Sequence, residues 1–514
     1  MVLILDSALG PWRPDLPDLN NPGVTVARNV TPGIGSFAGG VTYNPLRRAE
    51  LFFDTGMESR PTGTAVGQDQ FGTAKVYGGC ASKLYKLSPQ THAWTDVSRS
   101  GGYLSGDRER WNSVEFGSYQ ILTNFNDAPQ YIDMNTDDAP GAKFAPLTSL
   151  VRGRYVGTHK GYVILANTSD PLDGAKPNRI RWSGLETPAD WAFSAQTGAD
   201  FQDIHGYGAI QGIVCNDSVW IYMQRAVVQG TYIGAPYVFR FDTRVEGKGC
   251  TIPESLIAVE GKSFFFSDDG FYMHERGDQL APIGIGKINK HFLEDADPGF
   301  YQFMSVVADP RETLIYWSYV STQSPDNTPD KMLIYNYQTG EWSEAQSTTD
   351  FLFGARTLPW TIDQLDIYGS IDNVPASFDD PMWAGGNSIM WGMDMKGAIY
   401  SFSGPTLPAV IETQEQHLIN AVRAVDPRSM GDRTNVLGVR PLFEGAGGTV
   451  AVAVGSRSLS NGDVSWSLPS TTHPDTGFAP FRLQGRFHRV RLQFNGEWQK
   501  AFALQIDANS AGFR

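Results

Sequence analysis

Cysteine is scarce in this sequence, and long apolar stretches are missing. The 514 residues include only Cys80, Cys215 and Cys250, an odd and widely spaced set without a CxxC motif or a Cys/His cluster. A disulfide framework or a zinc site is therefore not expected. No stretch approaches the ~18 apolar residues of a membrane helix. The opening run Met1–Leu5 lacks the length and the basic flank of a signal peptide. We expect a soluble chain made in a reducing cytoplasm, with no membrane partner.

Motifs for catalysis, cofactors and metals are also missing. The eight histidines show no H-E-x-x-H spacing, and Gly35-Ser36 does not form the G-x-S-x-G turn of a nucleophilic serine. The stretch Gly284-Ile285-Gly286 lacks the third glycine of a dinucleotide-binding loop. We predict no cofactor, no metal and no catalytic residue, and therefore no enzyme.

Paired carboxylates are the one kind of catalytic centre that residue spacing does not exclude. In a glycosidase built on a propeller, the two acids come from different strands and meet only in the folded protein. Asp203, Glu246 and Asp394 are candidates of this kind, and the sequence does not distinguish them from acids in ordinary turns.

The charge balance is acidic and argues against tight binding of nucleic acid. There are 41 basic and 55 acidic side chains, giving a net charge of −14, and no run of Lys or Arg. Sequence-independent affinity for DNA comes from cations that displace counterions, so it is not expected here. Residues 415–514 hold 11 Lys/Arg and 8 Asp/Glu, a charge of +3, which leaves −17 for the rest.

Aromatic residues and turn formers are abundant, and a weak repeat runs through the middle of the chain. The sequence holds 13 Trp, 20 Tyr, 55 Gly and 31 Pro. An apolar pair, a polar turn and a run of strand formers recur near residues 114, 156, 213, 258 and 306. Hairpins at about 40–50 residue spacing are typical of propeller blades. We predict an all-β chain with a divergent β-propeller of six or seven blades over residues 51–414; a string of β-sandwiches is the alternative.

A second element follows some of these hairpins and supports the propeller. The run Leu84–Leu87 leads through a turn to Thr91 and Trp94, and the run Leu333–Tyr337 leads to Thr339 and Trp342. In both, Trp follows Thr by three residues. This pattern resembles the outer hairpin of kelch-type blades, in which the Trp packs between neighbouring sheets.

Residues 1–50 are predicted to form an extended, proline-rich arm. The segment Gly10–Gly23 has four prolines and no strand or helix period, yet it holds several apolar residues that a free tail would not need. Either the arm wraps its own domain or it docks on a neighbouring subunit. In the second case, deletion of residues 1–35 would stop assembly and leave the fold intact. The candidate assembly residues of the arm are Trp12, Arg13, Asp15, Leu16, Leu19, Asn20 and Asn21.

Residues 415–514 are predicted to form a small antiparallel domain that resembles a β-sandwich. The stretches Thr449–Gly455 and Arg486–Phe494 alternate as strands do, and Asn495-Gly496 is a strong hairpin turn. Arg489 and Arg491 share one strand face. This face either meets an acidic partner or DNA in the assembly, or is simply solvated.

The N-terminal sequence resembles tail proteins of short-tailed bacteriophages. The resemblance covers about 35 residues: Trp12–Gly23, Ala27–Val30 and Tyr43–Pro45. Beyond them, the plan of arm, divergent propeller and β-rich end is similar to the tail nozzle, or lower tail tube, proteins of these phages. The resemblance implies a homohexameric ring below the head-to-tail adaptor, in contact with tail fibres or tailspikes, that forms part of the DNA exit channel.

This family implies a structural protein of the virion tail that is assembled in the host cytoplasm. Viral DNA would pass through the channel without specific binding, because an acidic wall repels phosphates. Two other classes stay open: a propeller enzyme that acts on glycans, and a propeller scaffold that binds another protein.

Overall fold

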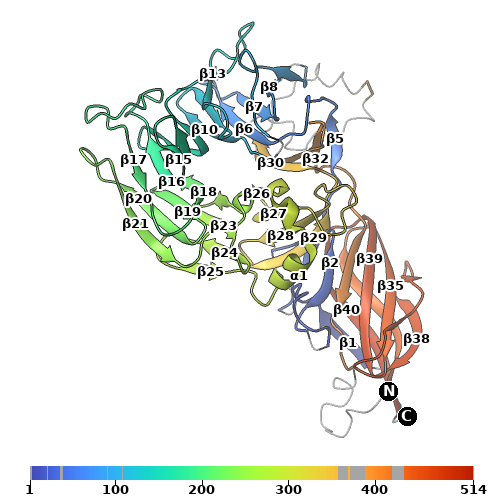
Figure 1. Ribbon diagram of the computed structural model, residues 1–514. Coiled ribbons are helices and arrows are strands. Elements are labelled where there is room, and N and C mark those ends of the chain that lie inside the picture. The colour runs from blue at the N-terminus through green and yellow to red at the C-terminus, as the bar shows by residue number, and fades with distance from the viewer. Residues whose placement is uncertain are drawn as a thin grey trace.

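Seven small antiparallel sheets follow one another around a central axis and form a β-propeller, with a β-sandwich attached at one side (Figure 1). The computed structural model describes residues 3–19, 21–34, 39–88, 91–106, 108–356, 369–370, 388–418 and 433–512. Six four-stranded sheets and the first four strands of a ten-stranded sheet make up the seven blades. The predicted fold class is confirmed, and the number of blades is seven.

The blades follow the order of the sequence. Blades 1 to 3 contain β6 (Gly63–Gln68), β7 (Ala74–Gly79), β8 (Leu84–Leu87), β9 (Trp94–Asp96); β10 (Asn112–Phe116), β11 (Tyr119–Thr123), β12 (Gln130–Asp133), β13 (Ala145–Pro146); β14 (Arg152–His159), β15 (Tyr162–Asp170), β16 (Gly174–Trp182), β17 (Asp200–Asp203). Blades 4 and 5 contain β18 (Ile210–Cys215), β19 (Val219–Met223), β20 (Ala226–Tyr232), β21 (Phe239–Glu246); β22 (Ile257–Val259), β23 (Lys262–Phe266), β24 (Phe271–His274), β25 (Leu280–Pro282). Blades 6 and 7 contain β26 (Ser305–Asp309), β27 (Leu314–Tyr319), β28 (Lys331–Asn336), β29 (Glu341–Gln346); β30 (Phe351–Arg356), β31 (Ser388–Met393), β32 (Ile399–Ser401), β5 (Glu50–Phe53).

The hairpins predicted from the repeat are the two innermost strands of blades 2 to 6. In the second strand of each of these blades, almost every side chain is buried, as in β15, β19 and β27. A strand that is apolar on both faces needs cover on both faces, and the neighbouring blades supply it. The apolar clusters of the core accordingly lie between blades, for example between blades 3 and 4.

The two tryptophans of the outer hairpins pack between blades, as predicted. Trp94 pairs with Leu87 in blade 1, and its indole N–H donates to the carbonyl of Gly397 in blade 7 at 2.9 Å. Trp342 pairs with Tyr335 in blade 6, and its indole N–H donates to the carbonyl of Ile283, which follows blade 5, at 3.0 Å. Each Trp therefore fills the space between two sheets and also satisfies its polar atom.

The ring is closed by a strand from the beginning of the chain. Strand β5 pairs antiparallel with β32, so that blade 7 takes three strands from residues 351–401 and its outermost strand from residues 50–53. Phe52 and Phe53 of β5 pack against the ring of Trp391 in β31, with centroids 5.6 and 6.0 Å apart. This pairing joins the two ends of the propeller sequence, which otherwise would be held only by side-chain packing.

The sandwich takes strands from both ends of the chain. One sheet has the order β3-β4-β40-β34-β38 with β1 beside β40, and the other has the order β2-β33-β39-β35-β36 with β37 beside β35. Their bounds are β1 (Leu3–Ala8), β2 (Val24–Arg28), β3 (Val30–Pro32), β4 (Tyr43–Pro45), β33 (Ala409–Thr413), β34 (Arg433–Glu444), β35 (Gly447–Arg457), β36 (Ser465–Trp466), β37 (Ser470–Thr471), β38 (Ala479–Gly485), β39 (Phe487–Glu497) and β40 (Lys500–Gly512).

The arm predicted over residues 1–50 is therefore confined to the segment between β1 and β2. The described remainder of these residues includes the short strands β1 to β4 and the first residue of β5, because β1 pairs with β40 and β2 pairs with β33, which lie far along the chain. The propeller accordingly begins with β5 and ends with β32, and the sandwich already includes β33, which lies before the predicted boundary at residue 415.

The hairpin turn predicted at Asn495-Gly496 is wrong. Both residues belong to β39 and pair with Thr449 and Gly448 of β35. The chain then passes at Trp498 into β40, which belongs to the opposite sheet. Gly496 has a φ of +76°, so the local backbone does favour glycine, but here it accompanies a crossing between sheets and not a tight turn.

Helices are few and short. The only α-helix in the described residues is α1 (Asn289–Asp295), and two 3-10 helices, η1 (Pro253–Ser255) and η2 (Pro298–Phe303), lie near it in the sequence. Within the described part of the chain, no helix combines the length and the hydropathy that a membrane span requires.

Candidate functional site at the junction of propeller and sandwich

The N-terminal arm lies across the junction between blade 6 and the sandwich. Trp12 is 1% exposed, and its indole N–H donates to the carbonyl of Thr25 at 3.2 Å. Its ring meets the ring of His291 in α1 edge to face, with centroids 5.2 Å apart. The apolar residue that the sequence placed in a proline-rich arm is thus a core residue of its own chain.

Asp15 caps helix α1. Its carboxylate accepts hydrogen bonds from the backbone N–H groups of Lys290 at 3.1 Å and His291 at 2.8 Å. The residue before the helix, Ile288, has no side chain that can do this, so the cap comes from the arm. Nearby, Arg13 forms an ion pair of 2.9 Å with Glu341 at the start of β29.

A chain of charged groups continues from His291 along the junction. Nε2 of His291 lies 3.2 Å from one carboxylate oxygen of Glu344, and the other oxygen accepts a hydrogen bond of 3.1 Å from Arg28 in β2. Burial alone would raise the pKa of Glu344, but the hydrogen bond and charge of His291, together with Arg28, hold it below its ordinary value. The group therefore stabilises the fold as an ionised carboxylate.

The other candidate residues of the arm also find partners in the same chain. Asn21 is 3% exposed, its amide donates to the carbonyl of Arg13, and its oxygen accepts from the N–H of Gly23. Leu19 forms a parallel bridge with Glu415, and Leu16 is half-buried. Asn20 lies outside the described residues. Of the two interpretations, the described arm fits the one in which it wraps its own domain.

The arginine face predicted on residues 486–494 is occupied and not free. Arg489 pairs with Asp18 of the arm and with Glu412 of β33, both at 3.1 Å, and Arg491 pairs with Glu412 at 2.8 Å. Both guanidinium groups also lie over the ring of Trp466, at 5.2 and 4.0 Å from its centroid. The neighbouring strand places its acid on the same face, which the sequence of β39 alone does not reveal.

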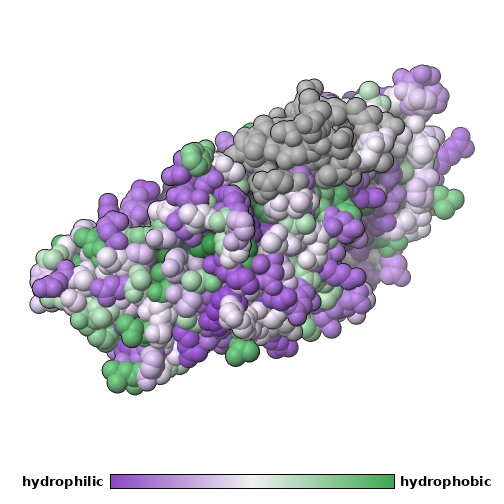
Figure 2. Space-filling model, turned by 90° about the horizontal axis from the view of Figure 1, so that it is seen from above, coloured by the Kyte–Doolittle hydropathy of each residue, from purple (hydrophilic) through white to green (hydrophobic). Residues whose placement is uncertain are grey.

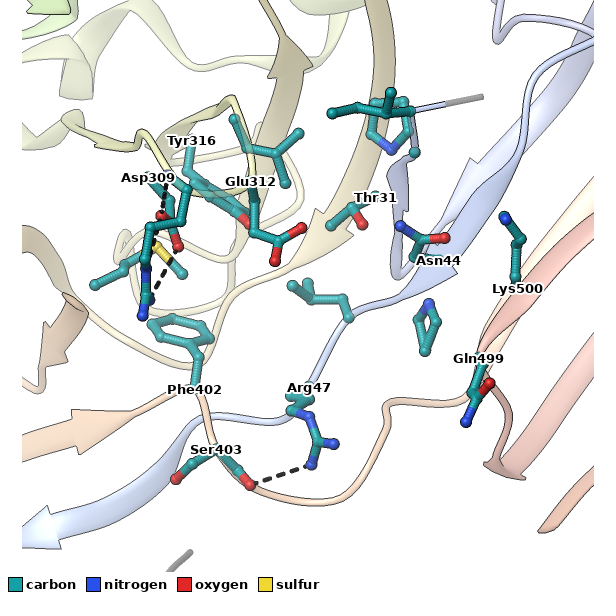
Figure 3. Close-up of a pocket in the computed structure, with 18 of the residues that line it drawn as sticks. Thr31, Asn44, Arg47, Asp309, Glu312, Tyr316, Phe402, Ser403, Gln499 and Lys500 are labelled. Atoms are coloured by element: carbon teal, nitrogen blue, oxygen red, sulfur yellow. Dashed lines mark hydrogen bonds and ion pairs between the residues drawn. The ribbon is translucent and has the colours of Figure 1, made fainter. Parts of the chain in front are cut away.

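On another side of the junction, blade 6, blade 7 and the sandwich enclose a cavity of about 800 Å³, which we call the interdomain cavity (Figure 3). Figure 3 shows the Glu312 carboxylate extending from blade 6 toward Thr31 and Asn44, with Gln499 and Lys500 on the sandwich side. Asp309 is held by Arg311 at 3.4 Å, so that Glu312 is the freer of the two acids in this hairpin. Apolar walls are supplied by Leu46, Leu314, Tyr316, Met390, Phe402 and Trp498.

The interdomain cavity carries charges of both signs on both sides. Asp309, Arg311 and Glu312 line it from blade 6, and Glu444 and Lys500 line it from the sandwich. Arg47, just after β4, adds a further cation, and apolar patches lie between these groups. Sequence analysis did not indicate this site, because its residues come from separated stretches of the chain that meet only in the folded structure. A local signal exists only for Glu312, which lies in the turn of a predicted hairpin.

The carboxylates considered for catalysis lie apart, each in a structural contact. Asp203 holds Arg179 at 2.6 Å at the edge of blade 3, Glu246 accepts a hydrogen bond from Tyr207, and Asp394 accepts from two backbone N–H groups in a turn of blade 7. They do not converge on the axis. The described residues also contain no group of three or more His, Cys, Asp or Glu positioned to hold a metal ion.

Comparisons with known proteins find similar propeller structures but no matching sequence family. No family model and no curated protein matches this sequence. A similar solved structure is BamB from Moraxella catarrhalis, with 13% identity over 77% of this chain and 97% of that chain and a TM-score of 0.35. Another is the extracellular domain of a putative one-component system from B. thetaiotaomicron, with 10% identity over 82% of this chain and 47% of that one and a TM-score of 0.39. A third is YCF48 bound to D1 peptide, with 10% identity, coverages of 62% and 87% and a TM-score of 0.33. Similarity at such low sequence identity bears on the fold alone and not on function.

Proposed function

We propose that this chain is the structural subunit of a short phage tail nozzle, a ring below the adaptor that forms part of the DNA exit channel. The proposal starts from the resemblance of the N-terminal sequence to such proteins. It is supported by one observation in particular: a single sheet of ten strands runs from blade 6 through β2 into the sandwich.

This shared sheet makes the junction stiff. Separate domains usually meet through modest interfaces and move relative to one another. Here β2 pairs with β29 at Arg28 and Glu344 on one side and with β33 through four residue pairs on the other, so a hinge motion at this point would break backbone hydrogen bonds. The arm contacts of Trp12 and Asp15 reinforce the same junction. A part that carries load between a capsid and a cell surface needs this rigidity.

The propeller axis of one subunit is not the conduit for DNA. The cavity there measures about 280 Å³, far too small for a duplex, and the bidentate pair of Arg60 and Asp350 lies close to it in sequence and space. In the proposed ring the channel therefore lies between subunits, around the symmetry axis. The net charge of −14 suits a wall along which DNA slides without being held.

We expect the contact between subunits of the ring to be largely polar. On the face seen in Figure 2, apolar residues occur as scattered groups among polar ones. In a closed ring, one patch of each subunit meets a different patch of the next. We therefore infer that the ring forms on the adaptor, which supplies the symmetry, and that the free subunit is a monomer.

Native mass spectrometry of the purified chain, alone and mixed with the adaptor of its own phage, tests the proposal. We expect a monomer alone and six copies on each adaptor ring. Electron micrographs of particles made without this chain should show tails shortened by one ring. A chain that stays monomeric with the adaptor, or particles with normal tails in its absence, would refute the proposed function.

A further inference from the structure

The seven blades leave an open cavity of about 280 Å³ at one end of the propeller axis, which we call the axial cavity. The first residues of several inner strands line it, together with η1. Its walls are partly aromatic, and its polar side chains come from different blades. The lining residues used below are Thr64, Arg110, Trp111, Asn112, Tyr155, Glu254, Phe351, Phe353 and Gly354.

Arg110 supplies the cation of this cavity and is held by the backbone. Its Nε donates to the carbonyl of Gln302 at 3.0 Å, and one terminal nitrogen donates to the carbonyl of Met304 at 3.1 Å. Its guanidinium carbon lies 5.0 Å from the ring centroid of Phe351. Burial lowers the pKa of Arg110 to about 10 in spite of the nearby carboxylate. The orientation of the guanidinium is thus fixed before any ligand arrives.

Glu254 supplies the acid, and its position is not explained by the fold. Burial raises the pKa of this carboxyl group above its ordinary value, and Arg110 and Arg154 offset this only in part through space. The described residues give Glu254 no ion-pair partner. In contrast, the neighbouring acids are tied: Asp350 by two bonds of 2.6 Å from Arg60, and Glu109 by Arg154 at 2.7 Å. Glu254 is half-buried and lines the axial cavity, so its carboxylate can accept hydrogen bonds from a ligand there.

We propose that the axial cavity binds one neutral sugar unit, with Glu254 accepting from sugar hydroxyls, Arg110 donating to them, and the aromatic walls covering the sugar ring. This inference does not depend on the proposed tail function; it adds a recognition site to a chain that otherwise acts mechanically.

The chemistry of the cavity favours a neutral ligand that both donates and accepts hydrogen bonds. One cation and one anion face the same space, so a singly charged ligand would be attracted by one and repelled by the other. The side chains of Thr64 and Asn112 add neutral donors and acceptors, and aromatic walls with a few placed polar groups are typical of ligand cavities. The volume of about 280 Å³ fits a single sugar ring.

The site should bind sugar without hydrolysing it. Glycoside hydrolysis by the usual route needs two carboxyl groups on either side of the scissile bond. Among the described lining residues, Glu254 is the only carboxylic acid, and the nearby Asp350 and Glu109 are held by arginines. A bound sugar therefore meets one acid and no second group to act as nucleophile or base.

The experiment is a titration of the full chain with D-glucose, D-galactose and D-mannose, followed by saturation-transfer NMR. We expect saturable millimolar binding of at least one sugar. Glu254→Gln keeps the shape but removes the charge, and it should weaken binding about tenfold, the equivalent of one charged hydrogen bond. Glu260→Gln, at the exposed tip of a blade 5 hairpin, is the matched control and should bind as the parent does.

A second variant tests the location of the binding site and leaves the charge of Glu254 unchanged. A Cβ at Gly354 would meet only Val307 at 3.6 Å, so Gly354→Trp can direct its ring into the axial cavity without a backbone clash, and it should abolish binding. No sugar binding by the parent chain, unchanged binding in both variants, or binding of free amino acids in place of sugars would overturn the proposal. Release of nitrophenol from nitrophenyl glycosides would overturn its non-hydrolytic part.

Discussion

The carboxylate of Asp15 accepts a hydrogen bond of 2.8 Å from the backbone N–H of His291, 276 residues further along the chain. A seven-residue helix is too short to be stable by itself, and the residue before it offers no side-chain cap. The helix therefore depends on the arm, and the arm is held in place by the helix. This mutual dependence ties the first residues of the chain to the propeller.

The first prediction concerns this cap. Asp15→Ala should lower the free energy of unfolding by about 1 kcal/mol, because two helix N–H groups lose their acceptor. Guanidinium unfolding followed by tryptophan fluorescence measures the change. Asp18→Ala is the control: Asp18 pairs with Arg489 as a half-exposed carboxylate, and the loss should be smaller. Equal losses in both variants would argue against a capping role.

The second prediction replaces the expectation that deletion of residues 1–35 would stop assembly and leave the fold intact. Deletion of residues 1–35 removes β1, β2 and β3, and with them the pairing partners of β40, β33 and β29. An exposed edge and an uncovered core should follow, so the truncated chain should aggregate or unfold. Its circular dichroism and solubility decide the matter, and a soluble, native-like truncated chain would contradict this assignment of the strands.

The third prediction concerns the closure of the ring by β5. Phe53 is 3% exposed and stacks on His92 with centroids 4.7 Å apart, whereas its strand neighbour Leu51 is 47% exposed. Phe53→Ala should cost about 3–5 kcal/mol through lost burial and a cavity, and Leu51→Ala should stay within about 0.5 kcal/mol. Denaturant midpoints measure both. Similar small losses would mean that the fourth strand of blade 7 contributes little to the ring.

The fourth prediction concerns acid stability. Burial lowers the pKa of His488 to about 4, from an ordinary value of 6.5, so the folded state keeps this ring neutral while the unfolded state takes up a proton. The stability associated with this neutral ring is therefore fully present above pH 6.5. As the pH falls toward 4, protonation of the ring in the unfolded state lowers the free energy of unfolding by about 3 kcal/mol in all.

Melting temperatures from pH 8 to pH 4 test this on two variants. His488→Gln should reduce the slope of the profile in this interval without removing it, because burial also lowers the pKa of His92 to about 4. His473→Gln, at an exposed site, should leave the slope of the parent. A slope that His488→Gln does not change would place the acid sensitivity in other groups.

Much of the propeller could be predicted from the sequence because the residue patterns that specify its hairpins lie within short stretches of the chain. The apolar pairs and turns near Val114, Ile213 and Val306 specify hairpins, and the Trp residues after Thr91 and Thr339 specify the outer strands. Each of these patterns reports on residues that are neighbours both in the chain and in space.

The parts that could not be predicted depend on pairing over long separations. The four residues of β5 have no strand period, and their partner Ile399 lies more than 340 residues away. The carboxylates that pair with Arg489 likewise come from distant segments, β33 and the arm. The residues that surround Glu312 in the interdomain cavity are also far apart in the sequence. Sequence reasoning located the arm correctly as a region of contact, but nothing local indicated that its contacts were with its own chain.

The pairing of β1 with β40 determines when the fold can be completed during protein synthesis. As the chain leaves the ribosome, β1, β2 and β5 have no strand partners until residues 399 to 508 have been synthesised. The first six blades can form during translation from local hairpins, but blade 7 and the sandwich can be completed only afterwards. The fold is thus completed in one late step, after nearly the whole chain has been synthesised.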